Sequence, residues 1–200
     1  MEKINLFGAS GHGRVIKEIV GAMGIEAGCF YDDAPKYDCL AGIPVLKADE
    51  AGIKGPVIVS IGDNAARRRV AERLKTDFAT AVHPSAVVSP TSRIAEGTVV
   101  MQGAIVQANA AIGRHCIINT GVSIDHDCRI ESFAHISPHA TLCGGVTVGE
   151  GSWVGAGAVI VQGVKIGRWC VIGAGSVVLK DIPDGVTAYG NPCEVRRTER

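Results

Sequence analysis

A six-residue repeat of aliphatic side chains runs through the second half of the chain. Every sixth residue from 82 to 178 is Ile, Leu or Val, without a break. These residues are Val82, Val88, Ile94, Val100, Val106, Ile112, Ile118, Ile124, Ile130, Ile136, Leu142, Val148, Val154, Ile160, Ile166, Ile172 and Val178. A period of six is neither the 3.6 residues of an α-helix nor the two-residue alternation of a half-buried strand. The repeat predicts units of one short strand and one corner.

A second column of residues follows each aliphatic position by four. All its members, from Ala86 to Ser176, are small or β-branched, and Cys116, Cys128 and Cys170 belong to it. Three of the six-residue units then close one triangular coil, with both columns pointing inward. We expect about five coils over roughly 25 Å, at about 4.8 Å per stacked strand. Because each coil packs only on its neighbours, both ends need caps.

The segment 1–80 does not follow this period. We expect strands at 4–7, 29–31 and 57–61, a turn at 8–13, and helices at 14–23 and 65–75. Strands that alternate with helices indicate a small parallel, Rossmann-like sheet. The predicted domains are therefore a small α/β domain at 1–80, a β-helix at 81–180 and a C-terminal tail at 181–200.

A glycine-rich loop follows the first expected strand. Its G-x-x-G-x-G spacing differs from the dinucleotide pattern G-x-G-x-x-G, and the segment 1–80 is long enough for only half of a dinucleotide domain, so we do not expect an NAD site. A helix N-terminus can still hold one pyrophosphate. Asp32 and Asp33, after the second strand, could accept hydrogen bonds from a nucleoside. The alternative is a tight turn with two solvated acids.

Charge and cysteine content exclude several classes of protein. Lys and Arg balance Asp and Glu at 20 each, so no bulk positive field indicates nucleic acid or an anionic membrane. We expect no signal peptide and no membrane span, because no apolar run approaches the roughly 20 residues that a span needs. The seven irregularly spaced cysteines suit a reducing, cytoplasmic environment.

The segment 119–145 is unusually polar for the wall of a solenoid. It contains His126 between Asp125 and Asp127, and an imidazole titrates near neutrality, as a general base should. Either acid could orient the ring. Gly144 follows His126 by one full coil, so its N–H should lie one rung away, about 5 Å from the ring. Such an N–H can stabilise an oxyanion.

His135 follows His126 by half a coil, so the two side chains should lie on different walls. If both serve one site, that site lies between neighbouring subunits. Two other interpretations stay open: the histidines are solvated wall residues, or His126, Cys128, His135, His139 and Cys143 bind zinc. The zinc hypothesis is weaker because the five residues occupy five different slots of the repeat. We expect no metal.

The repeat resembles that of the hexapeptide acyltransferases, whose fold is the left-handed parallel β-helix. Both halves together are similar to the nucleotide-sugar N-acetyltransferases of the bacillosamine pathway and to the related sialic acid O-acetyltransferases. The matching segments are 7–14 (FGASGHGR), 32–33 (DD), 60–64 (SIGDN), Asn119, 125–127 (DHD), 133–135 (FAH) and Gly144, and the tail from Lys180 resembles that of hexapeptide acetyltransferases in general.

The resemblance implies a role for each matching residue. His126 would be the catalytic base, Asp127 would raise its basicity, Gly144 would hold the acetyl carbonyl, and Asn119 would belong to the same catalytic set. Acetyl-CoA would contact His135, Gly144, Ala156 and Ala174. Ser10, Gly11 and His12 would face the pyrophosphate or sugar, and Asp32, Asp33 and Gly62 would face the nucleoside.

The resemblance also implies an activity and an assembly. We expect a cytoplasmic homotrimer of glycan biosynthesis that transfers acetyl from acetyl-CoA to the 4-amino group of a UDP-linked 4-amino-4,6-dideoxy sugar, without an acyl-enzyme. Alternative acceptors are sialic acid, through O-acetylation, and a GDP- or dTDP-linked amino sugar. A non-catalytic scaffold and a γ-carbonic-anhydrase-like metal protein are the remaining alternatives.

Overall fold

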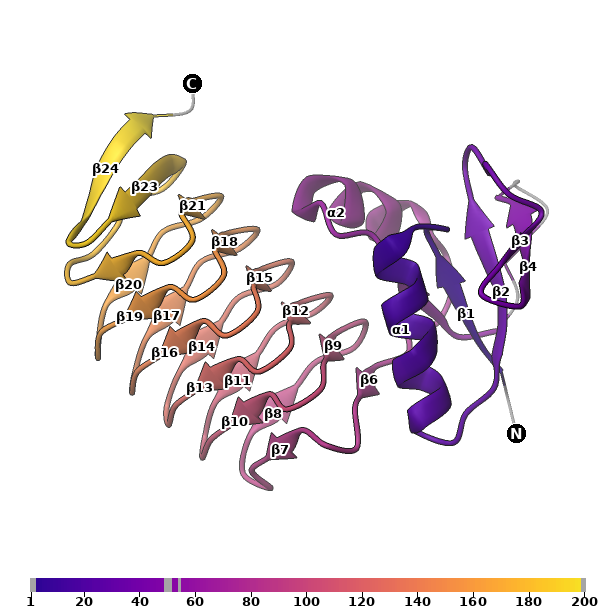
Figure 1. Ribbon diagram of the computed structural model, residues 1–200, viewed down its shortest axis with the longest axis horizontal. Helices are drawn as coiled ribbons and strands as arrows, with labels where there is room; N and C mark the ends of the chain where they lie inside the picture. Colours follow the sequence, from indigo (N-terminus) through magenta and orange to yellow (C-terminus); the bar gives the residue numbers. More distant parts are fainter. Residues whose placement is uncertain (1–2, 49–51, 54, 199–200) are drawn as a thin grey trace.

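The computed structural model describes residues 3–48, 52–53 and 55–198. Figure 1 shows a staircase of short strands, with a small α/β domain at one end and a hairpin at the other. This is the left-handed parallel β-helix with a preceding α/β domain that the repeat and the resemblance predict.

The α/β domain is built on five strands and two helices. Its elements are β1 (Ile4–Phe7), α1 (Gly11–Ala22), β2 (Ala27–Asp32), β3 (Cys39–Leu40), β4 (Ile43–Lys47), β5 (Val57–Val59) and α2 (Asn64–Arg73). The sheet order is β3-β4-β2-β1-β5, and all pairings are parallel except that of β3 with β4. The loops that follow β1, β2 and β5 therefore lie at one edge of the sheet.

Two expectations for this domain were wrong. Helix α1 begins at Gly11, inside the glycine-rich segment, because the Ser10 side chain caps it and accepts a hydrogen bond from the Gly13 N–H at 3.3 Å. A Cβ on Gly13 would lie 2.5 Å from the Gly8 carbonyl oxygen, so this glycine permits the close approach of helix and strand. The sequence interpretation also missed β3 and β4, whose short, mostly exposed strands show no clear alternation.

Seventeen two-residue strands form the three walls of the β-helix. They are β6 (Ala81–Val82), β7 (Val87–Val88), β8 (Arg93–Ile94), β9 (Val99–Val100), β10 (Ile105–Val106), β11 (Ala111–Ile112), β12 (Ile117–Ile118), β13 (Ser123–Ile124), β14 (Arg129–Ile130), β15 (His135–Ile136), β16 (Thr141–Leu142), β17 (Thr147–Val148), β18 (Trp153–Val154), β19 (Val159–Ile160), β20 (Lys165–Ile166), β21 (Val171–Ile172) and β22 (Val177–Val178). Each strand pairs in parallel with the strand one coil later, as Ile118 does with Ile136. The phase does not slip between β6 and β22.

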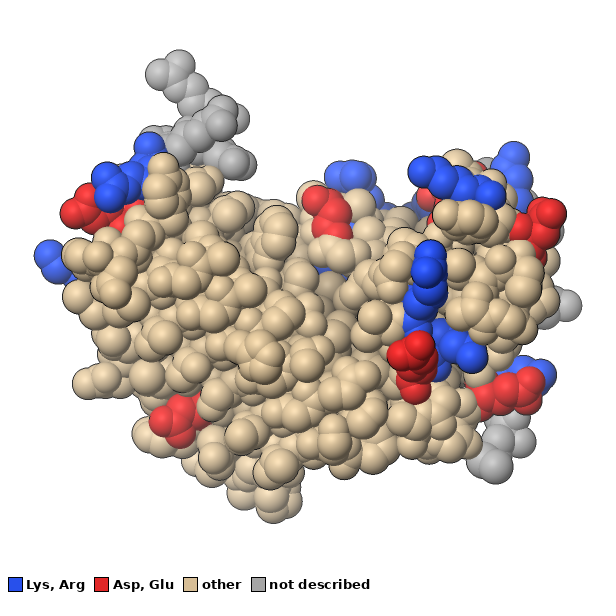
Figure 2. All heavy atoms as spheres, in the orientation of Figure 1, with Lys and Arg blue, Asp and Glu red and all other residues tan. Residues whose placement is uncertain are grey.

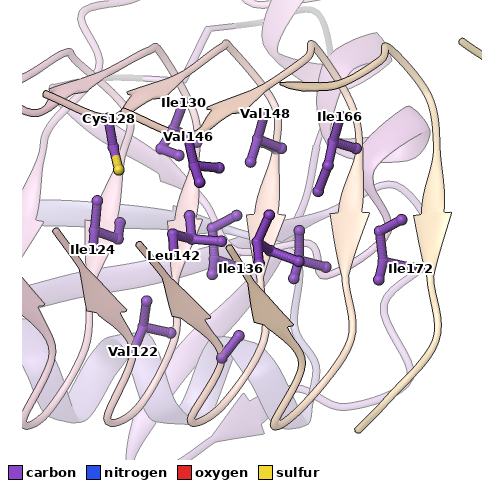
Figure 3. Packing of buried hydrophobic residues seen from close by; sticks show 14 of the residues in the cluster. Val122, Ile124, Cys128, Ile130, Ile136, Leu142, Val146, Val148, Ile166 and Ile172 are labelled. Atoms are coloured by element: carbon purple, nitrogen blue, oxygen red, sulfur yellow. The ribbon is translucent and has the colours of Figure 1, made fainter. Parts of the chain in front are cut away.

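The second residue of each strand points into the prism. Ile124, Ile130 and Leu142 are at most 1% exposed and pack beside the small inward column (Figure 3). Cys116, Cys128 and Cys170 are each 1% exposed within this core. Burial raises the pKa of the Cys116 thiol to about 12, so this cysteine behaves as a small core residue.

The α/β domain packs on the outside of one wall, and the C-terminal segment covers the far end of the β-helix. Ile16, Ile19 and Val20 of α1 share a buried cluster with the outward residues Val99 and Ile117, whereas the inward residues of the first coil, such as Val82 and Val88, stay partly exposed. At the other end, β23 (Val186–Gly190) pairs with β21 and forms an antiparallel hairpin with β24 (Cys193–Thr198). The C-terminal segment thus extends one wall of the prism. Within the described ranges, we find no helix with the length and apolar character of a membrane span.

Candidate active site

His126 lies on the corner between β13 and β14 and is held by its two sequence neighbours. Its Nδ1 lies 2.8 Å from Asp127 Oδ2, and its backbone N–H donates to Asp125 Oδ1 at 2.8 Å. Because a carboxylate only accepts, Nδ1 carries the proton and the lone pair of neutral His126 is on Nε2. The hydrogen bond to Asp127, aided by the charge of Asp125, raises the pKa of His126. The structure thus assigns ring orientation to Asp127, a choice that the sequence left open.

Gly144 lies beside this ring on the next coil. A Cβ at Gly144 would be 2.7 Å from both Cε1 and Nε2 of His126, so only glycine lets the imidazole keep this position. The Gly145 N–H donates to the His126 carbonyl at 2.9 Å, which fixes the two corners in register. The one-coil spacing in the sequence predicts this juxtaposition.

Asn119 and His135 form a second group. The Asn119 side-chain oxygen accepts from the Thr120 N–H at 2.8 Å, so its amide donates to His135 Nε2 at 3.0 Å. The His135 ring stacks on Trp153, with centroids 5.8 Å apart and planes within 6°. Burial, followed by the charges of Arg67 and His12, lowers the pKa of His135 to about 3, so the ring stays neutral at physiological pH.

Ala156 and Ala174 continue the edge on which Asn119 lies. Both are exposed, and the Gly175 N–H donates to the Ala156 carbonyl at 2.8 Å, so the two corners stack directly. A strand of the six-stranded sheet separates this edge from that of His126 and Gly144. The expected catalytic and acetyl-CoA residues therefore form two groups on different edges of one chain.

The N-terminus of α1 lies near the second group. Ser10 caps the helix, Gly11 is exposed in its first turn, and His12 acts electrostatically on His135. The Nε2 atom of His12 is buried without a hydrogen-bond partner, and burial, followed by the Arg67 charge, lowers the pKa of His12 to about 4. A neutral ring with one unused nitrogen can bind a polar ligand.

The residues expected to face the nucleoside are already engaged within the chain. Asp32 accepts from the N–H groups of Ala9 and Ala34, both at 2.9 Å. Asp33 pairs with Arg73 at 2.8 Å on the surface, and the Gly62 carbonyl accepts from Arg67 at 3.1 Å. Asp32 thus shapes the glycine-rich loop, in addition to any contact it makes with a ligand.

A pocket of about 320 Å³ opens between the glycine-rich loop and the segment after β2. Ser10, Gly11 and Asp32 line it, together with Arg14 and Lys36, which the sequence interpretation did not include among the site residues. Two cationic side chains beside a helix N-terminus suit an anionic ligand. Arg14 lies in the first turn of α1, so a helix start at Gly11 places it beside the loop. Lys36 is brought to the same pocket by the segment after β2.

Arg67 of α2 is a large, fully buried side chain whose burial the sequence did not reveal. It is 1% exposed and lies between the loop after β5 and the β-helix. Its sequence context, three successive arginines at 67–69, gives no sign that one is buried.

Within the described part of the chain, no three His, Cys, Asp or Glu side chains converge on a point where a metal ion could bind. The five residues of the zinc hypothesis lie on different faces, with Cys128 in the core and His126 on an exposed corner.

A left-handed β-helix with an imidazole–carboxylate pair at its edge defines the hexapeptide acyltransferase class. The PglD N-terminal domain family matches residues 3–74, and the bacterial transferase hexapeptide family (six repeats) matches residues 145–180. Both matches agree with the architecture described above.

Named relatives cover part or all of the chain. GDP-perosamine N-acetyltransferase of Escherichia coli O157:H7 is 31% identical over 99% of this chain and 98% of its own length. UDP-N-acetylbacillosamine N-acetyltransferase of Bacillus subtilis (strain 168) is 42% identical, but the match spans 50% of this chain and about half (51%) of that relative. A crystal structure of a mutant perosamine N-acetyltransferase from Caulobacter crescentus, in complex with CoA and GDP-perosamine, superposes with a TM-score of 0.94 at 37% identity over 98% of both chains.

The chain belongs to the family of hexapeptide-repeat sugar N-acetyltransferases, which act on nucleotide-linked amino sugars and depend on acetyl-CoA.

Proposed function

We propose that this protein transfers the acetyl group of acetyl-CoA to the 4-amino group of a nucleotide-linked 4-amino-4,6-dideoxy sugar, with His126 as the general base. The observation that carries the proposal is the His126 ring itself. Its Nδ1–H is held by Asp127, and its Nε2 lies against Gly144 on an exposed corner. This is the form of imidazole that can take a proton from an attacking amine.

The reaction needs no covalent enzyme intermediate. The sugar nitrogen attacks the thioester carbonyl and forms the amide bond, while Nε2 of His126 accepts the proton that the amine loses. The N–H of Gly144 stabilises the oxyanion of the tetrahedral intermediate. The carbon–sulfur bond then breaks, and the proton passes from His126 to the CoA thiolate.

The nucleotide sugar binds at the N-terminus of α1 in this proposal. Ser10, Gly11 and His12 receive the diphosphate, and Asp32, Asp33 and Gly62 lie near the nucleoside. A UDP-linked acceptor is the first candidate. It is supported by the UDP-N-acetylbacillosamine relative, which is 42% identical over half of the chain. A GDP-linked acceptor is the other candidate, and it is supported by the perosamine relatives, which match almost the whole chain.

The protein works as a homotrimer in this proposal, because His126 lies on one edge of the prism and His135 lies on the eight-stranded wall, which does not border that edge. The outward residues of the six-stranded wall carry no charge; they are Val87, Ile105, Ser123, Thr141, Val159 and Val177. The five-stranded wall instead presents Arg93, Arg129 and Lys165. An uncharged wall with exposed Val87 and Ile105 suits contact between subunits, which brings His126 of one copy to the acetyl-CoA edge of the next.

A thiol-release assay with acetyl-CoA and a panel of acceptors tests the proposed reaction. The panel holds UDP-, GDP- and dTDP-linked 4-amino sugars and sialic acid. We expect release only with a nucleotide-linked amine, and a fall of at least about 100-fold in kcat for His126→Ala, the usual scale for losing a general base. The exposed His83→Ala variant is the control.

Two results would reject this proposal. Turnover of sialic acid alone would replace N-acetylation by O-acetylation. Near-normal turnover by His126→Ala, with the oligomer intact, would remove His126 as the base.

A further inference from the structure

The guanidinium of Arg67 is buried and fully occupied by the protein. Its Nε donates to the His115 carbonyl at 2.8 Å, and Nη1 donates to the carbonyls of Ile61 and Gly62 at 3.0 and 3.1 Å. Its Nη2 donates to Asn64 Oδ1 and to the Phe133 carbonyl, both at 2.8 Å. The five N–H groups of an arginine thus have five acceptors, and none is left for a ligand.

These acceptors come from both domains. Ile61, Gly62 and Asn64 belong to the loop after β5 and the start of α2, while His115 and Phe133 lie on corners of the β-helix. The Asn64 amide extends the junction, because it donates to the Gly151 carbonyl at 3.0 Å. Arg67 therefore holds the α/β domain in place against the β-helix.

The acceptors of Arg67 are neutral, since none is a carboxylate. A buried charge without an ionic partner is costly, and burial accordingly lowers the pKa of Arg67 to about 10. Charge interactions with Cys116 and Asp63 only partly offset this lowering of the pKa. The positive charge thus remains largely uncompensated at the junction of the two domains.

The same charge acts on the imidazoles at this junction. Arg67 lowers the pKa of His12 and of His135, in both cases after burial, and His12 adds to the effect on His135. Arg67 and Arg114 act likewise on His115. Geometry gives the link to the start of α1, because Ser60 Oγ donates to the Gly8 carbonyl at 2.9 Å and so joins the loop that Arg67 holds to the loop that leads to His12. The unpartnered Nε2 of His12 lies at the end of that second loop.

We propose that Arg67 is a positioning residue whose buried charge, clamped between the domains, favours the diphosphate of the nucleotide sugar beside His12. The inference rests on the proposed function, because it takes the ligand to be a nucleoside diphosphate sugar. Arg67 does not touch the substrate. It acts through the loop at 61–62, which it holds, and through its field, which an anion at the N-terminus of α1 would compensate.

Binding of nucleotides of different charge tests this role. Calorimetry gives the Kd values of UDP and UMP, and of GDP and GMP, for the full-length protein and for Arg67→Met, Arg67→Lys and Arg68→Met. Arg68 is the matched control, because it lies next along α2 but is half-buried and its charge is paired with Glu72 and Glu150. NMR titration of His12 and His135 in the same proteins reports the field without any assay of activity.

We expect Arg67→Met to weaken diphosphate binding about tenfold while monophosphate binding changes much less, a difference that lost packing alone would not produce. The pKa of His12 and His135 should rise in this variant. Arg67→Lys, which keeps the charge, should retain both the diphosphate preference and the low histidine pKa values, and Arg68→Met should behave as the unmodified protein.

Each outcome is decisive. Equal losses for monophosphate and diphosphate, or unchanged histidine pKa values in a folded Arg67→Met, overturn the inference. If Arg67→Met does not fold, loss of the diphosphate preference in Arg67→Lys overturns it instead. If the unmodified protein binds none of the four nucleotides, the proposed function fails together with the inference. If it binds them and only the expected effects of Arg67→Met are missing, the inference alone fails.

Discussion

The imidazole of His126 is exposed, yet its orientation is fixed by residues next to it in the sequence. Asp127 adopts a left-handed backbone conformation with φ of 58°, which turns its carboxylate toward the His126 ring. Asn109, one coil earlier, donates to the other carboxylate oxygen at 3.3 Å. The pair is therefore held by the stacking of corners rather than by burial.

Replacing Asp127 by Asn should shift the pH dependence of the reaction. In the proposed reaction the catalytic form of His126 is neutral, so kcat/KM should rise with pH through the pKa of the ring, which the hydrogen bond to Asp127 raises. Asp127→Asn removes that stabilisation of the cation, so the inflection should move to lower pH and the plateau should fall. Asn tolerates the left-handed conformation, so the corner should keep its shape. The pH profile of kcat/KM with a saturating cosubstrate measures both effects.

Asp125→Asn is the matched control for this change. Asp125 bonds the backbone N–H of His126 and acts on the ring only as a nearby charge. It should move the inflection in the same direction but by less. A larger shift for Asp125→Asn than for Asp127→Asn would reverse the assignment of the orienting acid.

At the scale of elements, the sequence predicts the β-helix far better than the α/β domain. A strict six-residue period assigns each residue from 82 to 178 to a wall and a coil, and it predicts whether the side chain points inward. A single slip in the period would turn aliphatic side chains outward. The stacking of Gly144 on His126 follows from the same count.

Contacts between segments that are distant in the sequence cannot be predicted from the six-residue repeat. The start of α1 depends on Ser10 as a local cap, which the sequence interpretation overlooked, and on the close approach of Gly13 to Phe30 of β2, which is a tertiary contact. Burial of Arg67 depends on carbonyls at 115 and 133, far along the chain. The sequence therefore identified candidate site residues on each domain but not the residue that joins the domains.

Substitution within one strand should separate the inward face from the outward face. Ile130 is 1% exposed in β14, and Ile130→Ala should lower the free energy of unfolding by about 2–5 kcal/mol, since the cavity lies between rigid coils. Arg129→Ala, its exposed neighbour, should change it by no more than about 0.5 kcal/mol. Urea unfolding at one fixed protein concentration measures both. Equal losses would contradict the assigned faces.

At the scale of the whole molecule, the two groups of site residues lie apart on one chain, and for this reason the proposed site needs a neighbouring copy. His126 and Gly144 lie on one edge of the prism, and Asn119, with Ala156 and Ala174, lies on another. The broad β-helix surface in Figure 2 carries few Lys, Arg, Asp or Glu side chains. A three-fold arrangement that packs an uncharged wall would place the two edges opposite each other in neighbouring copies.

Complementation between two inactive variants tests this account most directly. His126→Ala and His135→Ala are purified separately, then unfolded, mixed in equal amounts and refolded together, and acetyl transfer to the preferred nucleotide sugar is measured. In mixed trimers some sites receive an intact His126 from one copy and an intact His135 from its neighbour. We expect each variant alone to be nearly inactive and the mixture to regain about a quarter of the unmodified rate, the share of such sites in a random assembly. A mixture no more active than the separate variants, although mass measurement shows mixed trimers, would contradict a site shared between subunits.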